Sequence, residues 1–322
     1  MAGRRILITG ASGCIGHYLS EAFIQHSDDD LFLLVRDRAK LQVEMGDRPG
    51  VSIIEGDMQD LDPLRPLLAT MHCAILVATG WGDFNIDVTQ TLALLQALDP
   101  QICQQVVYFS TASILGRDRS VLPEAKTLGT PYVQAKALCY EKLQDLDLGF
   151  PVVTVFPTLV VGGDPRKPYS HLSSGLPEVL KWTGLLRFLK ADGSFHFIHA
   201  QDIATVVLQL VQHPELAPSQ QLVLGNAPIT VNSAIATLCQ FTHRRIYTQF
   251  DLKPWLINLL IRAFNIQMAA WDHFCINYRH FQYENPVSPK TFGIPCYCST
   301  LRQVLQLSSP DHTPPQASRE ML

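Results

Sequence analysis

Short runs of apolar residues, separated by polar segments, recur through the first half of the chain. Each run is short and bounded by turn-forming residues, which is typical of a strand buried on both faces of a sheet. The expected strands are residues 5–9, 31–35, 51–55, 74–78, 105–109 and 152–156, and the expected helices are 15–26, 62–70, 87–98 and 130–146. Strands that alternate with helices form βαβ units, so the pattern predicts an α/β protein with a doubly wound parallel sheet.

The pattern changes after Gly162 and Gly163, where prolines and glycines mix with single helices and short strands near 195–198 and 221–224. We expect residues 1–160 to form the core and residues 161–307 to form mainly a smaller C-terminal lobe on the carboxyl edge of the sheet. A strand at about 221–225 should return from this lobe to the main sheet. Residues 308–322 contain three prolines and few apolar residues, which predicts a disordered tail.

Composition narrows the classes of protein that fit. The chain has 322 residues, 47% hydrophobic and 17% charged, so it can bury a large core. A net charge of −4 without a long basic run argues against nucleic-acid binding. There is no secretory leader pattern and no apolar run of about 18 residues, so we expect no integral membrane span. Eight scattered cysteines predict reduced thiols, no metal site and a cytoplasmic protein. We expect a monomer or a homodimer.

A glycine-spaced turn follows the first strand and opens the first helix. Gly10, Gly13 and Gly16 are three residues apart, in the place of a dinucleotide fingerprint. Gly10 would permit the tight turn, Gly13 would let the backbone approach a pyrophosphate, and Gly16 would let helix and strand pack closely. The residues expected to bind the nucleotide here are Gly10, Ser12, Gly13, Cys14, Ile15 and Gly16. The alternative is a tight turn without a ligand.

The charged residues after the second strand bear on which nucleotide binds. Arg36 stands twenty positions after Gly16, where an arginine suits the 2′-phosphate of NADP. Arg38 and Lys40 add positive charge nearby, whereas Asp37 leaves NAD open. A solvated charged loop is the alternative.

Two further loops would complete the nucleotide site. Asp57 could accept a hydrogen bond from the adenine amine and Met58 could pack against the ring, although Asp57 could equally cap the next turn. Ala78 and Thr79, after the fourth strand, are small enough for a cofactor to lie on the backbone.

Tyr132 and Lys136 are four residues apart on an expected helix, so their side chains share one face. A nearby ammonium favours the phenolate, so we expect Lys136 to lower the pKa of Tyr132 from its ordinary value of about 10. Such a pair can carry out acid–base chemistry near neutral pH.

These motifs together resemble the extended branch of the short-chain dehydrogenase/reductase superfamily, the NAD(P)-dependent epimerase/dehydratase-like proteins. The segments that carry the resemblance are 9–16, 110–116, 132–136 and 197–202. The resemblance implies a Rossmann fold, a catalytic set of Thr111, Tyr132 and Lys136, and a second role for Lys136 in holding the nicotinamide ribose. It also implies that Pro157 flanks the nicotinamide. His199 and Asp202, in the last segment, are expected to join the two lobes and not to take part in catalysis.

The resemblance leaves three functions open. Pro157 and Thr158 stand where nucleotide-sugar enzymes often have an asparagine, so the chain is closer to dihydroflavonol reductases and 3β-hydroxysteroid dehydrogenases. We therefore expect an NADP-dependent oxidoreductase that transfers a hydride between nicotinamide and a mostly apolar carbonyl or alcohol. The alternatives are a nucleotide-sugar epimerase or dehydratase with tightly bound NAD, and a non-catalytic NADP-binding sensor or assembly protein.

An apolar stretch at 252–264 adds one expectation about the C-terminal lobe. Its apolar spacing predicts a helix, which we expect to cover the substrate pocket. Such a helix would not cross a bilayer, because 13 helical residues span only about 20 Å. Peripheral contact with a membrane stays open.

Overall fold

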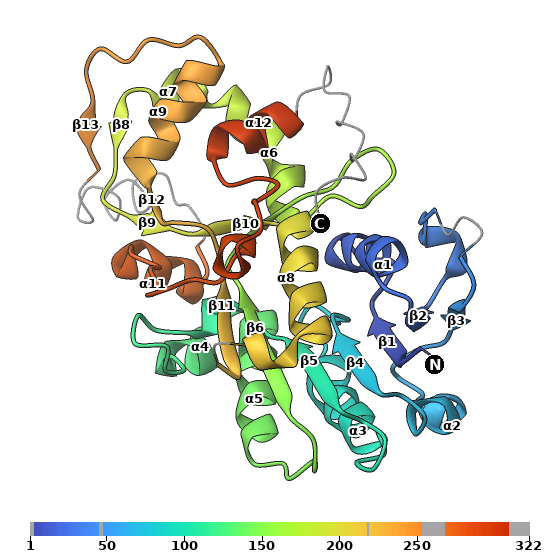
Figure 1. The fold of residues 1–322 in the computed structure, drawn as a ribbon. Helices are drawn as coiled ribbons and strands as arrows, with labels where there is room; N and C mark the ends of the chain where they lie inside the picture. The colour runs from blue at the N-terminus through green and yellow to red at the C-terminus, as the bar shows by residue number, and fades with distance from the viewer. Residues whose placement is uncertain (1–2, 45–47, 218, 253–267, 309–322) are drawn as a thin grey trace.

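The computed structural model describes residues 3–44, 48–217, 219–252 and 268–308. Seven strands form one parallel sheet in the order β11-β6-β5-β4-β1-β2-β3 (Figure 1). The strands are β1 (Arg5–Thr9), β2 (Asp30–Val35), β3 (Val51–Glu55), β4 (Cys73–Leu76), β5 (Gln105–Phe109), β6 (Val152–Pro157) and β11 (Gln221–Leu224). The predicted doubly wound parallel sheet is confirmed.

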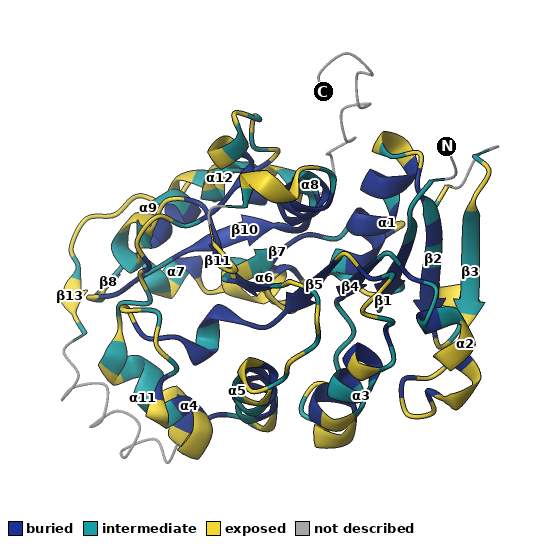
Figure 2. Ribbon diagram, turned by 60° about the horizontal axis from the view of Figure 1, so that its bottom comes forward, coloured by how far each residue is buried: buried dark blue, intermediate teal, exposed yellow. Residues whose placement is uncertain are grey.

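Helices cover both faces of the sheet (Figure 2). One face carries α1 (Cys14–His26) and α8 (Ala200–Gln212), which pack against each other. The other face carries α2 (Arg65–Leu68), α3 (Thr91–Gln96) and α5 (Pro131–Gln144). Between these elements lie η1 (Arg38–Lys40), η2 (Asp62–Leu64), a π-helical turn η3 (Asn85–Gln90), η4 (Ala112–Ile114) and α4 (Pro123–Thr127).

Alternation along the strands explains why the sheet needs helices on both faces. On β1, Ile6 and Ile8 pack in the core under α1 and α8, whereas Leu7 packs in the core of the opposite face. On β5, Val107 and Val106 divide in the same way. Successive side chains of a strand point to opposite faces, so an apolar run without polar residues requires two cores.

The remaining residues build a smaller lobe beyond the carboxyl ends of the central strands. Its helices are α6 (His171–Lys181), α7 (Thr183–Leu186), α9 (Val231–Phe241), α11 (Ala270–Tyr278) and α12 (Leu301–Leu307), with the short turn η6 (Pro289–Phe292). The turn η5 (Pro214–Leu216) instead joins α8 to β11 and packs against α8. Its strands pair in twos: β7 (Leu159–Val161) with β10 (Phe197–His199), β9 (Ser194–Phe195) with β12 (Ile229–Thr230), and β8 (Leu189–Lys190) with β13 (Phe250–Asp251). Between these lobe segments, α8 and β11 belong to the core, and β11 pairs with β6.

Several expected boundaries differ from the structure. The fourth strand ends at Leu76, so Ala78 lies in a loop. The expected helix 62–70 is a 3₁₀ turn followed by the four-residue helix α2, because Pro66, inside the expected helix, has no N–H to donate. The expected helix 87–98 begins as a π-helical turn at Asn85.

Two further expectations, the helix at 252–264 and the disordered tail, fall on residues outside the described ranges, Leu252 and Ser308 excepted. Within the described ranges, no helix is long and apolar enough to cross a membrane.

Candidate active site

A cavity of about 730 Å³ lies where the carboxyl ends of the central strands meet the smaller lobe. This volume is in the usual range for cofactor and ligand pockets. It spans the point between β1 and β4 where the strand order reverses, which is where open α/β sheets bind ligands. Every residue expected to bind cofactor or catalyse lines it: Gly10, Ser12, Gly13, Cys14, Ile15, Gly16, Arg36, Asp57, Met58, Ala78, Thr79, Thr111, Tyr132, Lys136 and Pro157.

Two glycines of the turn are required by the protein itself. Gly10 has φ +66°, and a Cβ there would lie 2.8 Å from the backbone of Ala78. A Cβ on Gly16 would overlap the Gly10 carbonyl oxygen and lie 2.7 Å from the Cα of Ala11. The first glycine therefore permits the turn, and the second lets α1 begin close to β1.

Gly13 has a different reason to be glycine. Its φ is −82°, which any residue can adopt, and the nearest atom to an added Cβ would be the Gly10 oxygen at 3.3 Å, so a side chain there would need only a small shift of that carbonyl. The space next to it is the cavity. Gly13 is also the N-cap of α1, which has no side-chain cap and no acidic residue in its first turn. Helix N–H groups that lack a partner attract anions, so this end of the cavity fits a dinucleotide pyrophosphate.

The acidic and basic residues of the loop after β2 make different contacts. The side chain of Asp37 accepts a hydrogen bond from Ala39 N at 2.9 Å and caps η1, and it does not line the cavity. Arg36 and Lys40 do line it. Lys40 approaches Asp37 only to 3.8 Å, with both side chains well exposed, so that ion pair is weak. The cations of this loop, and not its acid, therefore face the cavity.

The loops after β3 and β4 form the floor of the same end. Asp57 accepts a hydrogen bond from Gln59 N at 2.9 Å through Oδ1, which is the turn-capping alternative, while the residue also borders the cavity beside Met58. Sequence reasoning missed Thr9, whose buried Oγ1 accepts hydrogen bonds from Val77 N and Ala78 N at 3.1 and 3.2 Å. It ties the end of β4 to β1 and so places Ala78 against the glycine turn.

Hydroxyl groups gather where β5 ends. Thr111 is the N-cap of η4, and its Oγ1 donates to Ser113 Oγ at 3.3 Å. Ser110 also lines the cavity, and its buried Oγ has no hydrogen-bond partner. A buried hydroxyl without a partner is costly. Its position therefore fits a polar ligand atom at this point.

The chemistry of Tyr132 differs from the expectation. Burial raises the pKa of Tyr132 to about 12, while the nearby Thr111 hydroxyl opposes this change and the Asp87 carboxylate adds to it. Lys136 does not lower it, because its Nζ donates to the Phe109 carbonyl at 2.9 Å and burial lowers the pKa of the lysine itself. The prediction that Lys136 lowers the pKa of Tyr132 is therefore wrong for this structure, and Tyr132 is a phenol at neutral pH.

His199 and Asp202 lie outside the cavity lining, at the joint between core and lobe. His199 caps α8 by accepting from Gln201 N at 3.0 Å. Asp202 accepts from Tyr297 N at 2.6 Å and from Cys298 N at 3.1 Å. Their contacts are those of residues that hold the lobe in place. No group of three or more potential metal ligands occurs among the described residues.

The sequence of residues 6–225 matches the NAD dependent epimerase/dehydratase family. The chain belongs to this family. The resemblance to extended short-chain dehydrogenase/reductases is thereby confirmed, and with it the prediction of an enzyme that uses a nicotinamide cofactor. No curated protein matches the sequence.

Solved structures share the fold at low identity. The terminal R domain from the myxalamid PKS-NRPS biosynthetic pathway is 16% identical, with a TM-score of 0.65 over 96% of this chain and 90% of that one. The structure of gox2253 is 18% identical, with a TM-score of 0.64 over 88% and 90%. The dTDP-glucose 4,6-dehydratase of Bacillus anthracis str. Ames, in complex with NAD, is 12% identical, with a TM-score of 0.63 over 95% and 96%.

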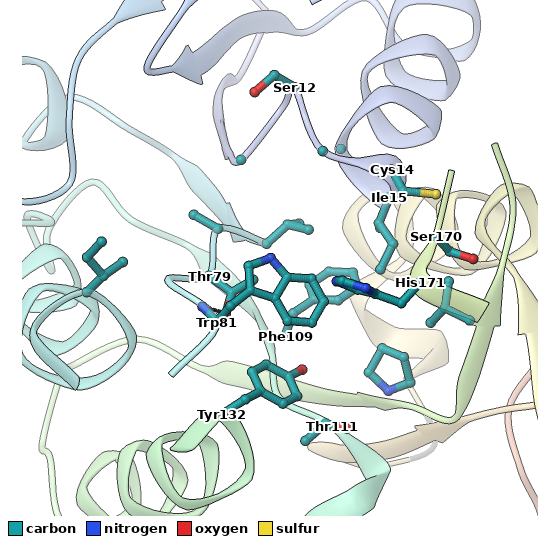
Figure 3. Close-up of a pocket in the computed structure, with 18 of the residues that line it drawn as sticks. Ser12, Cys14, Ile15, Thr79, Trp81, Phe109, Thr111, Tyr132, Ser170 and His171 are labelled. Carbon is teal, nitrogen blue, oxygen red and sulfur yellow. Dashed lines mark hydrogen bonds between the residues drawn. The ribbon is translucent and has the colours of Figure 1, made fainter. Parts of the chain in front are cut away.

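Sequence reasoning missed the aromatic residues of this family member's cavity. Trp81 and His171 line it together with Tyr132 (Figure 3). Trp81 lies in the loop after β4, and His171 begins α6 in the other lobe, so no spacing relates them. The one available signal was Gly80-Trp81-Gly82, an indole between two glycines directly after a strand.

Proposed function

We propose that the protein is an NADP-dependent oxidoreductase that transfers a hydride between nicotinamide and a mostly apolar carbonyl or alcohol. The distribution of charge in the cavity carries this proposal. The charged side chains lining it are Arg36, Lys40, Asp57 and Lys136. The first three follow β2 and β3, on the far side of β1 from Tyr132, and Lys136 is 3% exposed with its Nζ on a backbone carbonyl.

The opposite end of the cavity, called the substrate end below, consists of Trp81, Tyr132, Leu159, His171 and Leu172. Among the described residues, the one arginine or lysine that lines the cavity near this end is Lys136, whose Nζ donates to the Phe109 carbonyl, although a nucleotide sugar would bring a diphosphate that cations should hold. Desolvating that diphosphate without a partner is unfavourable, whereas an apolar substrate would lose nothing. This contrast supports an apolar carbonyl over a nucleotide sugar.

The preference for NADP rests on the loop after β2. Asp37 caps η1 and does not line the cavity, whereas Arg36 and Lys40 border it. Their positive charge would favour a 2′-phosphate through charge-assisted hydrogen bonds.

The residues around Tyr132 can handle the proton of a carbonyl reduction. The bound nicotinamide would supply or accept the hydride. Tyr132, a phenol at neutral pH, would donate its proton to the substrate oxygen, and the Thr111 hydroxyl would orient that oxygen. Lys136 would hold the nicotinamide ribose and keep positive charge near the oxygen as it develops negative charge.

A nucleotide-sugar epimerase or dehydratase remains the second candidate, because relatives of the same fold include dTDP-glucose 4,6-dehydratase. A sensor without catalysis is disfavoured by the presence of Tyr132 and Lys136 in one cavity. We also propose a cytoplasmic setting, since all eight cysteines are free thiols.

The test measures NADPH oxidation by absorbance with a panel of apolar ketones and aldehydes and with UDP-, GDP- and dTDP-sugars. We expect turnover with at least one apolar carbonyl, and none with the sugars. If a nucleotide sugar is converted while bound NAD copurifies with the protein and NADPH is not consumed, the second candidate is correct and this proposal is wrong.

A further inference from the structure

Trp81 has a conformation that the fold alone does not explain. Its φ is +55°, in the left-handed region that non-glycine residues rarely adopt, and its side chain is 59% exposed. Both features cost free energy. The indole adds nothing to the buried core, so its position needs another reason.

A buried carboxylate fixes the loop that carries this indole. Asp87 is 1% exposed and accepts three hydrogen bonds: from Thr79 Oγ1 at 2.8 Å, Gly80 N at 2.7 Å and Gly82 N at 2.8 Å. Thr79 Oγ1 in turn accepts from Trp81 N at 3.2 Å. A charged acceptor makes strong hydrogen bonds, so the backbone on both sides of Trp81 is held in one arrangement.

The flanking glycine brings the same loop close to the helix that carries Tyr132. A Cβ on Gly82 would lie 2.8 Å from Tyr132 N and 2.7 Å from Pro131 Cβ. Only glycine allows this approach, and its φ of +102° also favours glycine. The position of Trp81 relative to Tyr132 is therefore set by backbone contacts.

The indole faces the aromatic residues of the substrate end. Its ring centroid is 5.2 Å from that of Tyr132, with the planes tilted by 33°, and 4.2 Å from that of His171, with the planes at 77° (Figure 3). His171 comes from α6, so the contact joins the core to the smaller lobe at the substrate end. A substrate oxygen that reaches the Tyr132 hydroxyl would bring its neighbouring atoms beside this indole.

We propose that Trp81 is a specificity-determining residue whose indole stacks on a flat, unsaturated group attached to the reacting carbonyl. The proposal rests on the proposed function and names the substrate class within it: an aryl or conjugated carbonyl in preference to its saturated counterpart. Asp87 holds the loop that carries Trp81 and is therefore a positioning residue for the indole. Stacking of two π-systems adds to the area that both substrates bury, and it corresponds to roughly a three- to tenfold preference.

The test compares acetophenone with cyclohexyl methyl ketone, which match in size and apolar character. Their binding is measured by calorimetry to Tyr132→Phe in complex with NADPH, so that no turnover is needed. We expect acetophenone to bind about three- to tenfold more tightly. Trp81→Leu in the same background should remove this preference. The matched control is Trp182→Leu, at a 55% exposed tryptophan outside the cavity lining, which should leave the preference unchanged.

Equal affinities for the two ketones, no detectable acetophenone binding, or a preference that survives Trp81→Leu would each overturn the inference. So would a loss of NADPH affinity in Trp81→Leu as large as the loss for acetophenone, since the indole would then contact the cofactor. Assays on the wild-type protein separate the two proposals. A binding preference without NADPH oxidation leaves the inference standing and refutes the proposed function, whereas turnover of both ketones without a preference does the reverse.

Discussion

The two ends of the cavity are built in different ways. The nucleotide end, formed by the glycine turn with Arg36, Lys40, Asp57 and Met58, is built from the loops that follow the neighbouring strands β1, β2 and β3. The substrate end consists of residues from a loop after β4, from α5, from β7 and from α6, elements that are spread over the chain. Backbone geometry leaves a spacing pattern in the sequence, whereas side chains brought together by folding leave none.

This difference determines which effects separate the two ends experimentally. A substitution at the nucleotide end should alter the affinity for the cofactor, whichever substrate is used. A change at the substrate end should alter turnover or preference while cofactor affinity stays the same.

The largest effect is expected from Tyr132→Phe. The substitution keeps the ring, and so its contact with Trp81, but removes the proton donor, so turnover should fall by about 10²–10⁴-fold. The affinity for NADPH, measured by fluorescence titration, should remain within about twofold because the packing is preserved and only the hydroxyl is removed. Near-normal turnover on any carbonyl that the wild type reduces would refute the assigned role.

The next largest effect is expected on the pH dependence of stability, from His199 and Asp202 between the core and the smaller lobe. Burial lowers the pKa of His199 to about 4 from 6.5, so its contribution to stability is complete above 6.5 and is lost as the pH falls toward 4. Burial raises the pKa of Asp202 to about 6 from 3.8, so its contribution is complete below 3.8 and is lost as the pH rises through 6. Each pKa shift changes the free energy of unfolding by roughly 3 kcal/mol, and the contributions of His199 and Asp202 offset each other between pH 4 and 6.

Replacing either His199 or Asp202 should expose the pH-dependent stability contribution of the other residue. In Asp202→Asn, the free energy of unfolding should fall by roughly 3 kcal/mol as the pH falls from 6.5 to 4, in urea titrations at several pH values. The control is His199→Asn, which keeps an N-cap acceptor and should show the opposite slope. If Asp202→Asn instead lowers turnover at pH 7 without altering stability, the pair belongs to the chemistry and not to the joint.

At the nucleotide end, Arg36→Ala should reduce the affinity for NADP about ten- to a hundredfold and leave that for NAD nearly unchanged, since a charge-assisted contact contributes about 1.5–3 kcal/mol. Titrations of both cofactors measure this. Arg38→Ala is the matched control, because Arg38 lies in η1 but not in the cavity lining. Equal wild-type affinities for NADP and NAD would contradict the proposed preference.

The smallest effect distinguishes two glycines of one turn. Gly16→Ala should destabilise the fold by about 1–3 kcal/mol, because its Cβ would overlap the Gly10 carbonyl oxygen. Gly13→Ala should destabilise the fold less, by up to about 1 kcal/mol, because its Cβ would meet only the Gly10 carbonyl oxygen, at 3.3 Å, and alanine is a poorer N-cap than glycine. It should weaken cofactor binding about tenfold, because the added methyl group borders the cavity. Thermal unfolding and cofactor titration of both variants test this. A large loss of stability in Gly13→Ala would mean that this glycine serves the fold alone.

The sequence by itself determined the sheet, its helices and the nucleotide end. Apolar runs without polar residues require burial on both faces, and only flanking helices provide it. Gly10 and Gly16 are visible in the sequence because close backbone packing excludes every other residue at these positions. Arg36 and Asp57 could be found because they lie one and two residues after strands whose ends are fixed by the sheet.

Only the tertiary structure decided how these residues act. The i, i+4 spacing predicted that Tyr132 and Lys136 share one helix face. In the structure, burial raises the pKa of Tyr132, and the ammonium group of Lys136 donates a hydrogen bond to the Phe109 carbonyl. The sequence places Asp87 at the start of an expected helix and gives no sign that the 79–82 loop donates hydrogen bonds to its carboxylate. Trp81 and His171 meet because α6 of the smaller lobe packs over the core. Solvation and long-range contacts depend on the whole fold, and a local spacing pattern does not record them.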